Sequence, residues 1–269
     1  MCHCLSVSRS SFYSWLASPT SNRAKEDLLF IEKIKEIFKD SLQTYGTRRI
    51  KLALAKLGYK ISRRRICRLM KNASLSCRAK RKFKATTDSN HNLPVAENLL
   101  NRRFTVTKAN THYVGDITYI QTQEGWLYLA VVIDLFSRKV VGYAMENNMR
   151  AELVNRALLN AIWQRKPPAG LVWHTDRGSQ YASTSHRKIL SMFNIQQSMS
   201  RRANCWDNAV SESFFHTLKV ELVHNIAFKS REAAKLAIFE YIEAFYNKKR
   251  MHSANDYLSP DEFELVQNM

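Results

Sequence analysis

An uninterrupted apolar run from Leu127 to Ile133 constrains the fold of this chain more than any other feature of its sequence. A strand with one exposed face alternates apolar and polar residues, whereas a run that is apolar at every position is typical of a strand covered on both faces. Strand-like segments over 114–121 and 139–145 flank this run, and the short turns between them predict a three-stranded antiparallel meander. Such a sheet needs helices to cover its faces.

The rest of the C-terminal part supplies those helices. The spacing of apolar residues predicts helices and two further short strands. The predicted helices span 151–164, 185–192, 209–224 and 230–247, and the predicted strands span 171–174 and 194–198. We therefore expect an α/β fold, with a mixed five-stranded sheet flanked by helices.

The N-terminal part has a helical pattern only, with predicted helices over 24–42, 47–57 and 62–72. Gly58 is placed to end the second helix, and Ser62 is placed to cap the third. A helix, a short turn and a second helix form the helix-turn-helix pattern, which presents the first turn of its second helix to DNA. A solvated basic hairpin is the alternative. The candidate DNA contacts of this motif are Arg48, Arg49, Arg63, Arg64 and Arg65.

Charge is spread unevenly along the chain. Residues 1–110 hold 24 basic and 7 acidic residues, a net charge of +17, whereas residues 111–269 hold 18 and 16, a net charge of +2. This pattern favours a nucleic-acid-binding segment joined to a differently specialised domain. With 45% hydrophobic and 11% aromatic residues the chain is not a disordered protein. It also has no apolar run near the roughly 20 residues of a membrane helix, so we expect no membrane partner and a cytoplasmic location.

These patterns predict three parts: a helical helix-turn-helix DNA-binding region over 1–77, a basic linker over 78–108, and an α/β core with C-terminal helices over 109–269. The linker begins with a basic run, residues 78–84, and continues with a polar stretch.

Three carboxylates stand apart from the solvent-facing acidic residues. Asp116 interrupts a strand, Asp176 directly follows a short buried strand, and Glu212 lies in a helix. A carboxylate in or beside a buried strand is costly unless it is paired or metal-bound, and hard oxygen ligands suit Mg²⁺ or Mn²⁺. Asp134 and Asp207 are also placed near strand or helix ends, and these patterns alone do not exclude them.

Several stretches of the chain resemble the second-frame transposases of the insertion sequence three family, which are integrase-like enzymes. The matching stretches are Asp116-Ile-Thr-Tyr-Ile, residues 128–142, His174-Thr-Asp-Arg-Gly-Ser-Gln-Tyr181, residues 198–208, residues 212–219, residues 245–253 and Leu258-Ser-Pro260. The resemblance runs from Tyr45 onward and covers over three quarters of the chain. Asp176 and Glu212 are separated by 35 residues, the gap typical of this class.

The resemblance implies a ribonuclease-H-like core in which Asp116, Asp176 and Glu212 form an Asp-Asp-Glu triad that holds two Mg²⁺ or Mn²⁺ ions. It implies that Lys219 touches DNA near the scissile phosphate, with a solvated lysine as the alternative. His174, Gln180 and Asn208 are candidate site-lining residues, although His174 could equally be a core histidine. Trp206 could stack on a base or pack within the protein.

The family's pattern differs from this chain at two places. Tyr113 and Val210-Ser211 stand where relatives often have Trp and Pro-Met, but neither change touches the triad. The upstream leucine-zipper region is also missing, and in this family it belongs to a first-frame protein or to a frameshifted fusion. The expected partners are therefore the element's terminal repeats, target DNA, further copies of the chain and that first-frame protein.

The expected function is metal-dependent DNA cleavage and strand transfer, in which water or a 3′-hydroxyl attacks a phosphodiester at the element's end. Two alternatives stay open. One is a DNA-binding regulator from a decayed element with an inert core, and the other is a nuclease that digests an RNA–DNA hybrid.

Overall fold

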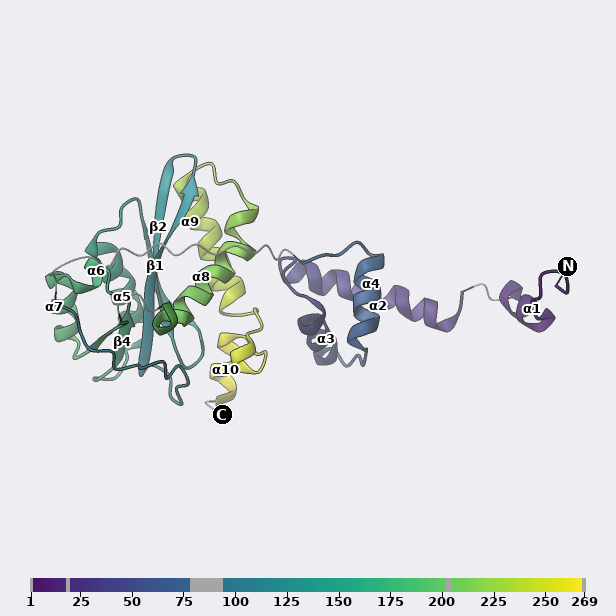
Figure 1. The fold of residues 1–269 in the computed structure, drawn as a ribbon, viewed down its shortest axis with the longest axis horizontal. Coiled ribbons are helices and arrows are strands. Elements are labelled where there is room, and N and C mark those ends of the chain that lie inside the picture. Colours follow the sequence, from purple (N-terminus) through teal and green to yellow (C-terminus); the bar gives the residue numbers. More distant parts are fainter. Residues whose placement is uncertain (1, 18–19, 78–93, 202–204, 268–269) are drawn as a thin grey trace. The chain divides into compact units, whose positions relative to one another are not determined.

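The computed structural model describes residues 2–17, 20–77, 94–201 and 205–267 (Figure 1). The chain divides into two compact units, Met1–Arg78 and Ala79–Met269. None of the helices in these described ranges is long and apolar enough to cross a membrane.

The N-terminal unit is all helical. Its helices are α1 (Arg9–Ala17), α2 (Asn22–Asp40), α3 (Thr47–Lys56) and α4 (Arg63–Asn72). Ser62 caps α4, as expected, because its side chain accepts a hydrogen bond from the backbone N–H of Arg65. Helices α2, α3 and α4 contact one another through buried apolar side chains, which include Ile34, Leu54 and Ile66. Helix α1, which the sequence did not predict, buries none of its residues.

The second unit contains one mixed sheet with the strand order β3-β2-β1-β4-β5. Its strands are β1 (His112–Thr122), β2 (Gly125–Asp134), β3 (Val140–Glu146), β4 (Val172–Thr175) and β5 (Gln196–Met199). The first three strands pair antiparallel, and β4 and β5 add to the β1 edge in parallel. The prediction of a mixed five-stranded sheet with a three-stranded meander is confirmed.

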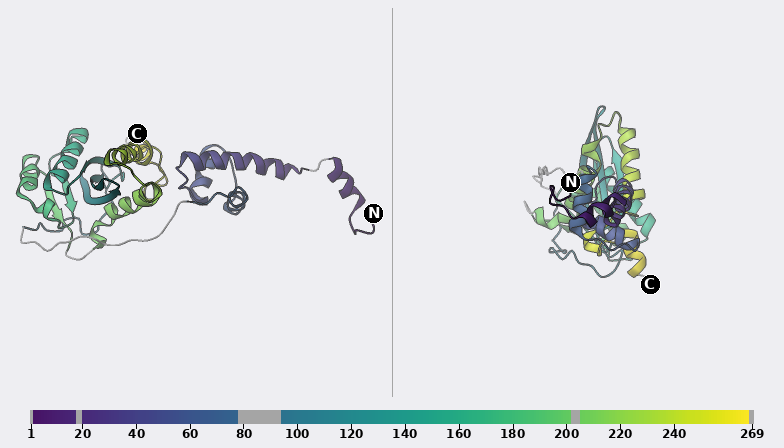
Figure 2. Two further views of the ribbon diagram at one scale, coloured as in Figure 1. Left: turned by 90° about the horizontal axis from the view of Figure 1, so that it is seen from above. Right: turned by 90° about the vertical axis from the view of Figure 1, so that its right-hand side faces the viewer.

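Helices lie on both sides of this sheet (Figures 1 and 2). On one side are α5 (Ala151–Arg165), α6 (Ser179–Ala182) and α7 (Thr184–Met192), and on the other are α8 (Ala209–Glu221) and α9 (Arg231–Glu240). Helix α5 packs closely on β3, because a Cβ at Gly142 would lie 2.5 Å from the backbone oxygen of Ala157. This double covering explains why the run in β2 is apolar at every position.

The C-terminal region differs from the single helix expected over 230–247. Helix α9 ends at Glu240 and continues as a π-helix, Tyr241–Tyr246. The side chain of Asn247 then bonds to both backbone groups of Val140 at 3.0 Å, which ties this region to β3. The remaining elements are the short 3₁₀ segments η1 (Cys205–Asn208), η2 (Val223–Asn225) and η4 (Ser253–Asn255), and helix α10 (Pro260–Gln267), which the sequence did not predict.

Part of the segment predicted as a linker lies against the second unit. Leu100 is buried, the backbone N–H of Leu99 donates to Ser198 Oγ at 2.9 Å, and Arg138 donates to the backbone oxygen of Phe104 at 2.9 Å. Residues 78–93, which include the basic run, lie outside the described residues.

Candidate active site

Asp116 lies in β1, and Asp176 directly follows the neighbouring strand β4. Strands β1 and β4 run parallel with Val114 opposite His174, so each aspartate lies two residues beyond the last paired position. Asp116 Oδ1 accepts a hydrogen bond from the backbone N–H of Ile117 at 2.8 Å, and Asp176 Oδ1 accepts one from Gly178 at 2.9 Å. Parallel pairing thus brings together two residues that are far apart in the sequence.

Glu212 approaches from a third element, the first turn of helix α8. Helix α8 contacts β1, and Asn208, at its N-cap, donates to the backbone oxygen of Gly115 at 3.5 Å. The start of α8 therefore lies beside the part of β1 that carries Asp116.

The pKa values indicate that the three carboxylates share one electrostatic environment. Burial and then the charges of Asp176 and Glu212 raise the pKa of Asp116 well above its ordinary value, against the opposing charge of Lys219. Burial also raises the pKa of the half-buried Glu212. Tyr181 is fully buried nearby, and burial together with the charges of both aspartates raises its pKa. A bound cation would relieve this repulsion.

The structure does not gather the triad around one point. In the described ranges, no three His, Cys, Asp or Glu side chains are close enough together to hold a metal ion. The side-chain Oδ1 of Asn208 is nevertheless buried without a hydrogen-bond partner, next to this group of carboxylates. The donors present are hard oxygen ligands of the kind that Mg²⁺ and Mn²⁺ prefer.

Lys219 lies two helical turns after Glu212, and its Nζ is 5.1 Å from the centroid of the Tyr119 ring. Burial lowers the pKa of Lys219, although the neighbouring Tyr119 and Asp116 partly oppose that effect. Tyr119 also packs edge-to-face on Trp126 at 5.0 Å, and both rings are partly exposed. The sequence did not single out this aromatic pair, because nothing in either strand marks the two positions as neighbours of Lys219.

His174 has the environment of a core histidine, the second of the two readings left open. Its side chain is 1% exposed, with Nδ1 2.8 Å from Ser198 Oγ and Nε2 3.0 Å from the backbone oxygen of Asp207. Burial lowers its pKa to about 4, so the ring is neutral at physiological pH. Gln180 donates to the backbone oxygen of Met149 at 3.0 Å, whereas Trp206 is 68% exposed and available for stacking.

Asp134 and Asp207 are both fully buried, and each has local partners that explain it. Asp134 accepts backbone hydrogen bonds from Asn110 and Phe136 at 2.8 and 3.0 Å, and burial raises its pKa to about 6. Asp207 is bonded to the guanidinium of Arg201, which holds its pKa well below the usual range. Both carboxylates are therefore satisfied by groups of the protein and do not need a metal ion.

The predicted arginines of the N-terminal unit fall into two groups. Arg48, Arg63 and Arg64 are exposed. Arg65 instead bonds to Asp27 on α2 at 2.7 Å and lies over the ring of Phe30. Arg49 lies over the ring of Tyr45, 5.3 Å from its centroid.

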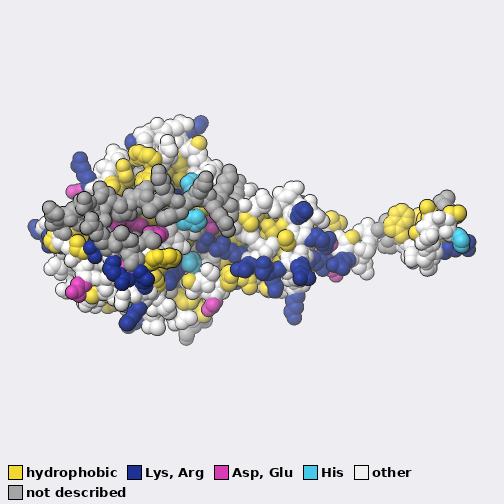
Figure 3. Space-filling model, in the orientation of Figure 1, with side chains coloured by type: hydrophobic (Ala, Val, Ile, Leu, Met, Phe, Trp, Pro, Cys, Tyr) yellow, Lys and Arg dark blue, Asp and Glu magenta, His cyan; other side chains and the backbone are white. Residues whose placement is uncertain are grey.

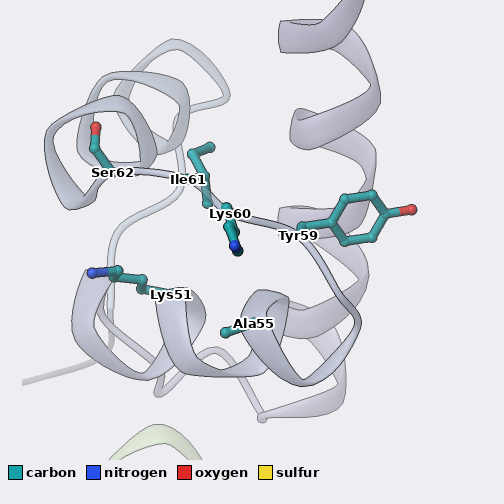
Figure 4. Close-up of a pocket in the computed structure, with 6 residues that line it drawn as sticks. All are labelled: Lys51, Ala55, Tyr59, Lys60, Ile61 and Ser62. Atoms are coloured by element: carbon teal, nitrogen blue, oxygen red, sulfur yellow. The ribbon is translucent and has the colours of Figure 1, made fainter.

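A hollow of about 420 Å³ lies between α3 and α4 of the same unit. It is lined by Lys51 and Ala55 of α3, by the turn 59–61 and by Ser62 (Figure 4). Lys51 and Lys60 each contribute an amine to this lining. Lys and Arg side chains also cluster over the visible face of this unit (Figure 3). A cationic surface of this kind suits a DNA backbone.

A mixed sheet with helices on both faces and acidic residues on β1, after β4 and on α8 defines the integrase class of polynucleotidyl transferases. Family models described as Integrase core domain match residues 106–205 and 212–267, and an HTH-like domain matches residues 24–83. A simian T-cell lymphotropic virus intasome in complex with the PP2A regulatory subunit B56 gamma has a similar fold. The match has a TM-score of 0.50 and 18% identity, and it covers 81% of this chain and 70% of that chain.

The chain is also similar to curated proteins over nearly its full length. It is 46% identical to the insertion element IS600 uncharacterized 31 kDa protein of Shigella sonnei, over 98% of this chain and 97% of that protein. It is 42% identical to transposase InsF for insertion sequence IS3A of Escherichia coli K12, over 98% and 92% respectively. The chain therefore belongs to the IS3 family of transposases.

Proposed function

We propose that the second unit cleaves DNA at the ends of an insertion sequence and joins those ends to target DNA, with Asp116, Asp176 and Glu212 as its catalytic residues. The observation that carries this proposal is the convergence of three elements: β1 and β4 pair in parallel just before Asp116 and Asp176, and the start of α8, which carries Glu212, contacts β1 beside Asp116. The raised pKa of Asp116, caused by burial and then by the charges of the other two carboxylates, supports it. Perturbed carboxylates that converge from separate elements are typical of a catalytic metal site.

The three carboxylates would hold two Mg²⁺ or Mn²⁺ ions, which supply activation of the attacking oxygen and stabilisation of the leaving oxygen when bound. Asp116 lies in β1 and Asp176 directly follows the neighbouring strand β4, and Glu212 would complete the set from the first turn of α8. Lys219, two turns along α8, would bind the phosphate next to the scissile bond. The triad residues act as ligands, so no side chain of this protein forms a covalent bond to DNA.

The N-terminal unit would bind the terminal repeats of the element through Arg48, Arg63 and Arg64, which are exposed. In this organisation residues 1–77 bind DNA, 109–269 carry out the chemistry and 78–108 connect the two, with residues 98–104 lying against the second unit. We further propose that copies of the chain assemble on DNA in the bacterial cytosol, together with the first-frame protein of the same element.

The proposal is tested by measuring strand transfer on terminal-repeat DNA in Mg²⁺, with Asp176→Asn beside the wild-type protein. We expect the variant to bind the DNA normally and to lose cleavage and joining. Retained joining by Asp176→Asn would refute the site. A wild-type protein that binds this DNA without any metal-dependent nicking would favour the inert regulator, and cleavage of an RNA–DNA hybrid in place of joining would favour the nuclease.

A further inference from the structure

The carboxylate of Asp207 is the most heavily hydrogen-bonded acidic group near the candidate site. It is fully buried in η1, directly before helix α8. Arg201 donates to it from its backbone N–H, Nε and Nη2 at 2.8–2.9 Å. Arg102 Nε and Asn98 Nδ2 donate to it at 3.0 and 2.9 Å. A buried carboxylate satisfied in this way is a fixed point, because moving it would break several charge-assisted bonds together.

This fixed point lies between the elements that carry the triad. The backbone oxygen of Asp207 is 3.0 Å from His174 Nε2, on the strand that leads to Asp176. The next residue, Asn208, contacts the backbone of Gly115, which precedes Asp116. Helix α8 starts immediately afterwards and carries Glu212 in its first turn.

Two of the donors come from outside the matched integrase core. The Integrase core domain match begins at residue 106, whereas Asn98 and Arg102 lie before it and more than 100 residues before Asp207. Their segment is held in place by buried Leu100 and by two bonds to β5: Leu99 N–H to Ser198 Oγ, and Met199 N–H to the backbone oxygen of Glu97 at 3.3 Å.

We propose that Asn98 and Arg102 are positioning residues for the catalytic site. Through Asp207 they hold the start of α8, which carries Glu212 in its first turn, against β1 and β4. The assignment of Glu212 rests on the proposed function, but the restraint of α8 by these two residues does not.

The geometry predicts a local effect when one donor is removed. The Arg102 side chain is 47% exposed, so its truncation opens no cavity in the core. Arg201 keeps its three bonds to Asp207, so the carboxylate stays paired. The start of α8 should therefore loosen without unfolding of the unit.

The test compares Arg102→Ala with Arg103→Ala in the full chain. Arg103 is the neighbouring arginine and is exposed, and within the described residues its side chain makes no hydrogen bond or ion pair, which makes it a matched control. Three properties are measured: hydrogen exchange of the amides in 205–215, the single-turnover strand-transfer rate in Mg²⁺, and Tm. We expect Arg102→Ala to exchange about tenfold faster in that segment alone and to react about tenfold more slowly, as for one lost charge-assisted hydrogen bond. Tm and DNA binding should not change.

Equal exchange and equal rates in the two variants would overturn the proposal. Faster exchange throughout the second unit, with a lower Tm, would also overturn it, because Arg102 would then only stabilise the fold. Asn98→Ala provides a second test, with the same local pattern and a smaller amplitude. The exchange result is independent of the catalytic assignment: if Glu212→Gln were fully active, the proposed function would fail while local loosening in Arg102→Ala would still be measurable.

Discussion

The two units hold their functional charges in opposite ways. The N-terminal unit places cations on its surface, where Arg48, Arg63 and Arg64 are solvated and come from two helices adjacent in the sequence. The second unit places its three carboxylates at partly buried positions, and they lie in β1, directly after β4 and in α8. Surface cations bind a polyanion by displacing counterions, whereas crowded, poorly hydrated carboxylates store repulsion that a divalent cation relieves. The difference teaches that binding and chemistry place opposite demands on burial.

The largest expected effect concerns the partly buried carboxylates of the second unit. Glu212→Gln should lower the strand-transfer rate at least about a thousandfold, because a metal ligand supports several kcal/mol of transition-state stabilisation. The control is Glu240→Gln, which replaces an exposed acidic residue of α9 and should react like the wild type. Rates are measured with pre-cleaved terminal-repeat DNA, so that joining is scored alone. A loss of less than tenfold in Glu212→Gln would remove this residue from the triad.

A buried histidine of the second unit, His186, should make the stability of that unit depend on pH. Burial lowers the pKa of His186 in the second unit to about 4. Its neutral ring accepts a bond from Trp173 Nε1 at 2.9 Å, and its Nδ1 is 2.7 Å from Asn155 Oδ1. The unfolded histidine gains a proton near pH 6.5, whereas the folded one stays neutral until about pH 4. The contribution of the neutral His186 ring to the free energy of unfolding is therefore fully present above pH 6.5 and is lost as pH falls toward 4.

This linkage is worth about 3 kcal/mol between pH 6.5 and 4. Urea unfolding followed by tryptophan fluorescence reports mainly on the second unit, which holds four of the five tryptophans. The free energy of unfolding should fall by about 3 kcal/mol more in the wild type than in His186→Gln over that range. Parallel pH profiles for the two proteins would contradict the neutral, buried state of this ring.

The exposed cations should have a smaller effect that depends on salt. The double variant Arg63→Ala/Arg64→Ala should bind terminal-repeat DNA about tenfold more weakly or worse, with the salt slope reduced by about two, because two phosphate contacts are lost. Lys39→Ala, an exposed lysine on α2, is the control. Affinity is measured by fluorescence anisotropy at several salt concentrations. An unchanged slope would show that the first turn of α4 does not face DNA.

The smallest expected effect separates Arg65 from its two neighbours. Arg65→Ala should lower Tm of the N-terminal unit by a few degrees, because it removes the contacts of α4 with Asp27 and Phe30. Arg64→Ala, which lacks these contacts, should leave Tm unchanged. Circular dichroism at 222 nm follows the helices. The opposite ranking of the two variants would mean that Arg65 is the surface contact.

The sequence predicted most of what local pattern controls. Apolar periodicity located the five strands and most of the helices, and Ser62 caps the helix it was expected to cap. The sequence did not predict that Arg65 contacts α2, since helical spacing does not show which residues of another helix lie opposite. The hydrogen bonds of Asn98 and Arg102 to Asp207 were not predicted for the same reason, because they join residues more than 100 positions apart. The π-helix was missed because its residues keep the same apolar pattern as an α-helix.

The most direct test of the central claim is the position of Mn²⁺ in crystals of the protein bound to terminal-repeat DNA, located by anomalous scattering. The account predicts Mn²⁺ within roughly 2.0–2.4 Å of carboxylate oxygens from Asp116, Asp176 and Glu212. Mn²⁺ bound at Asp134 or Asp207, with none at those three side chains while DNA occupies the site, would contradict it.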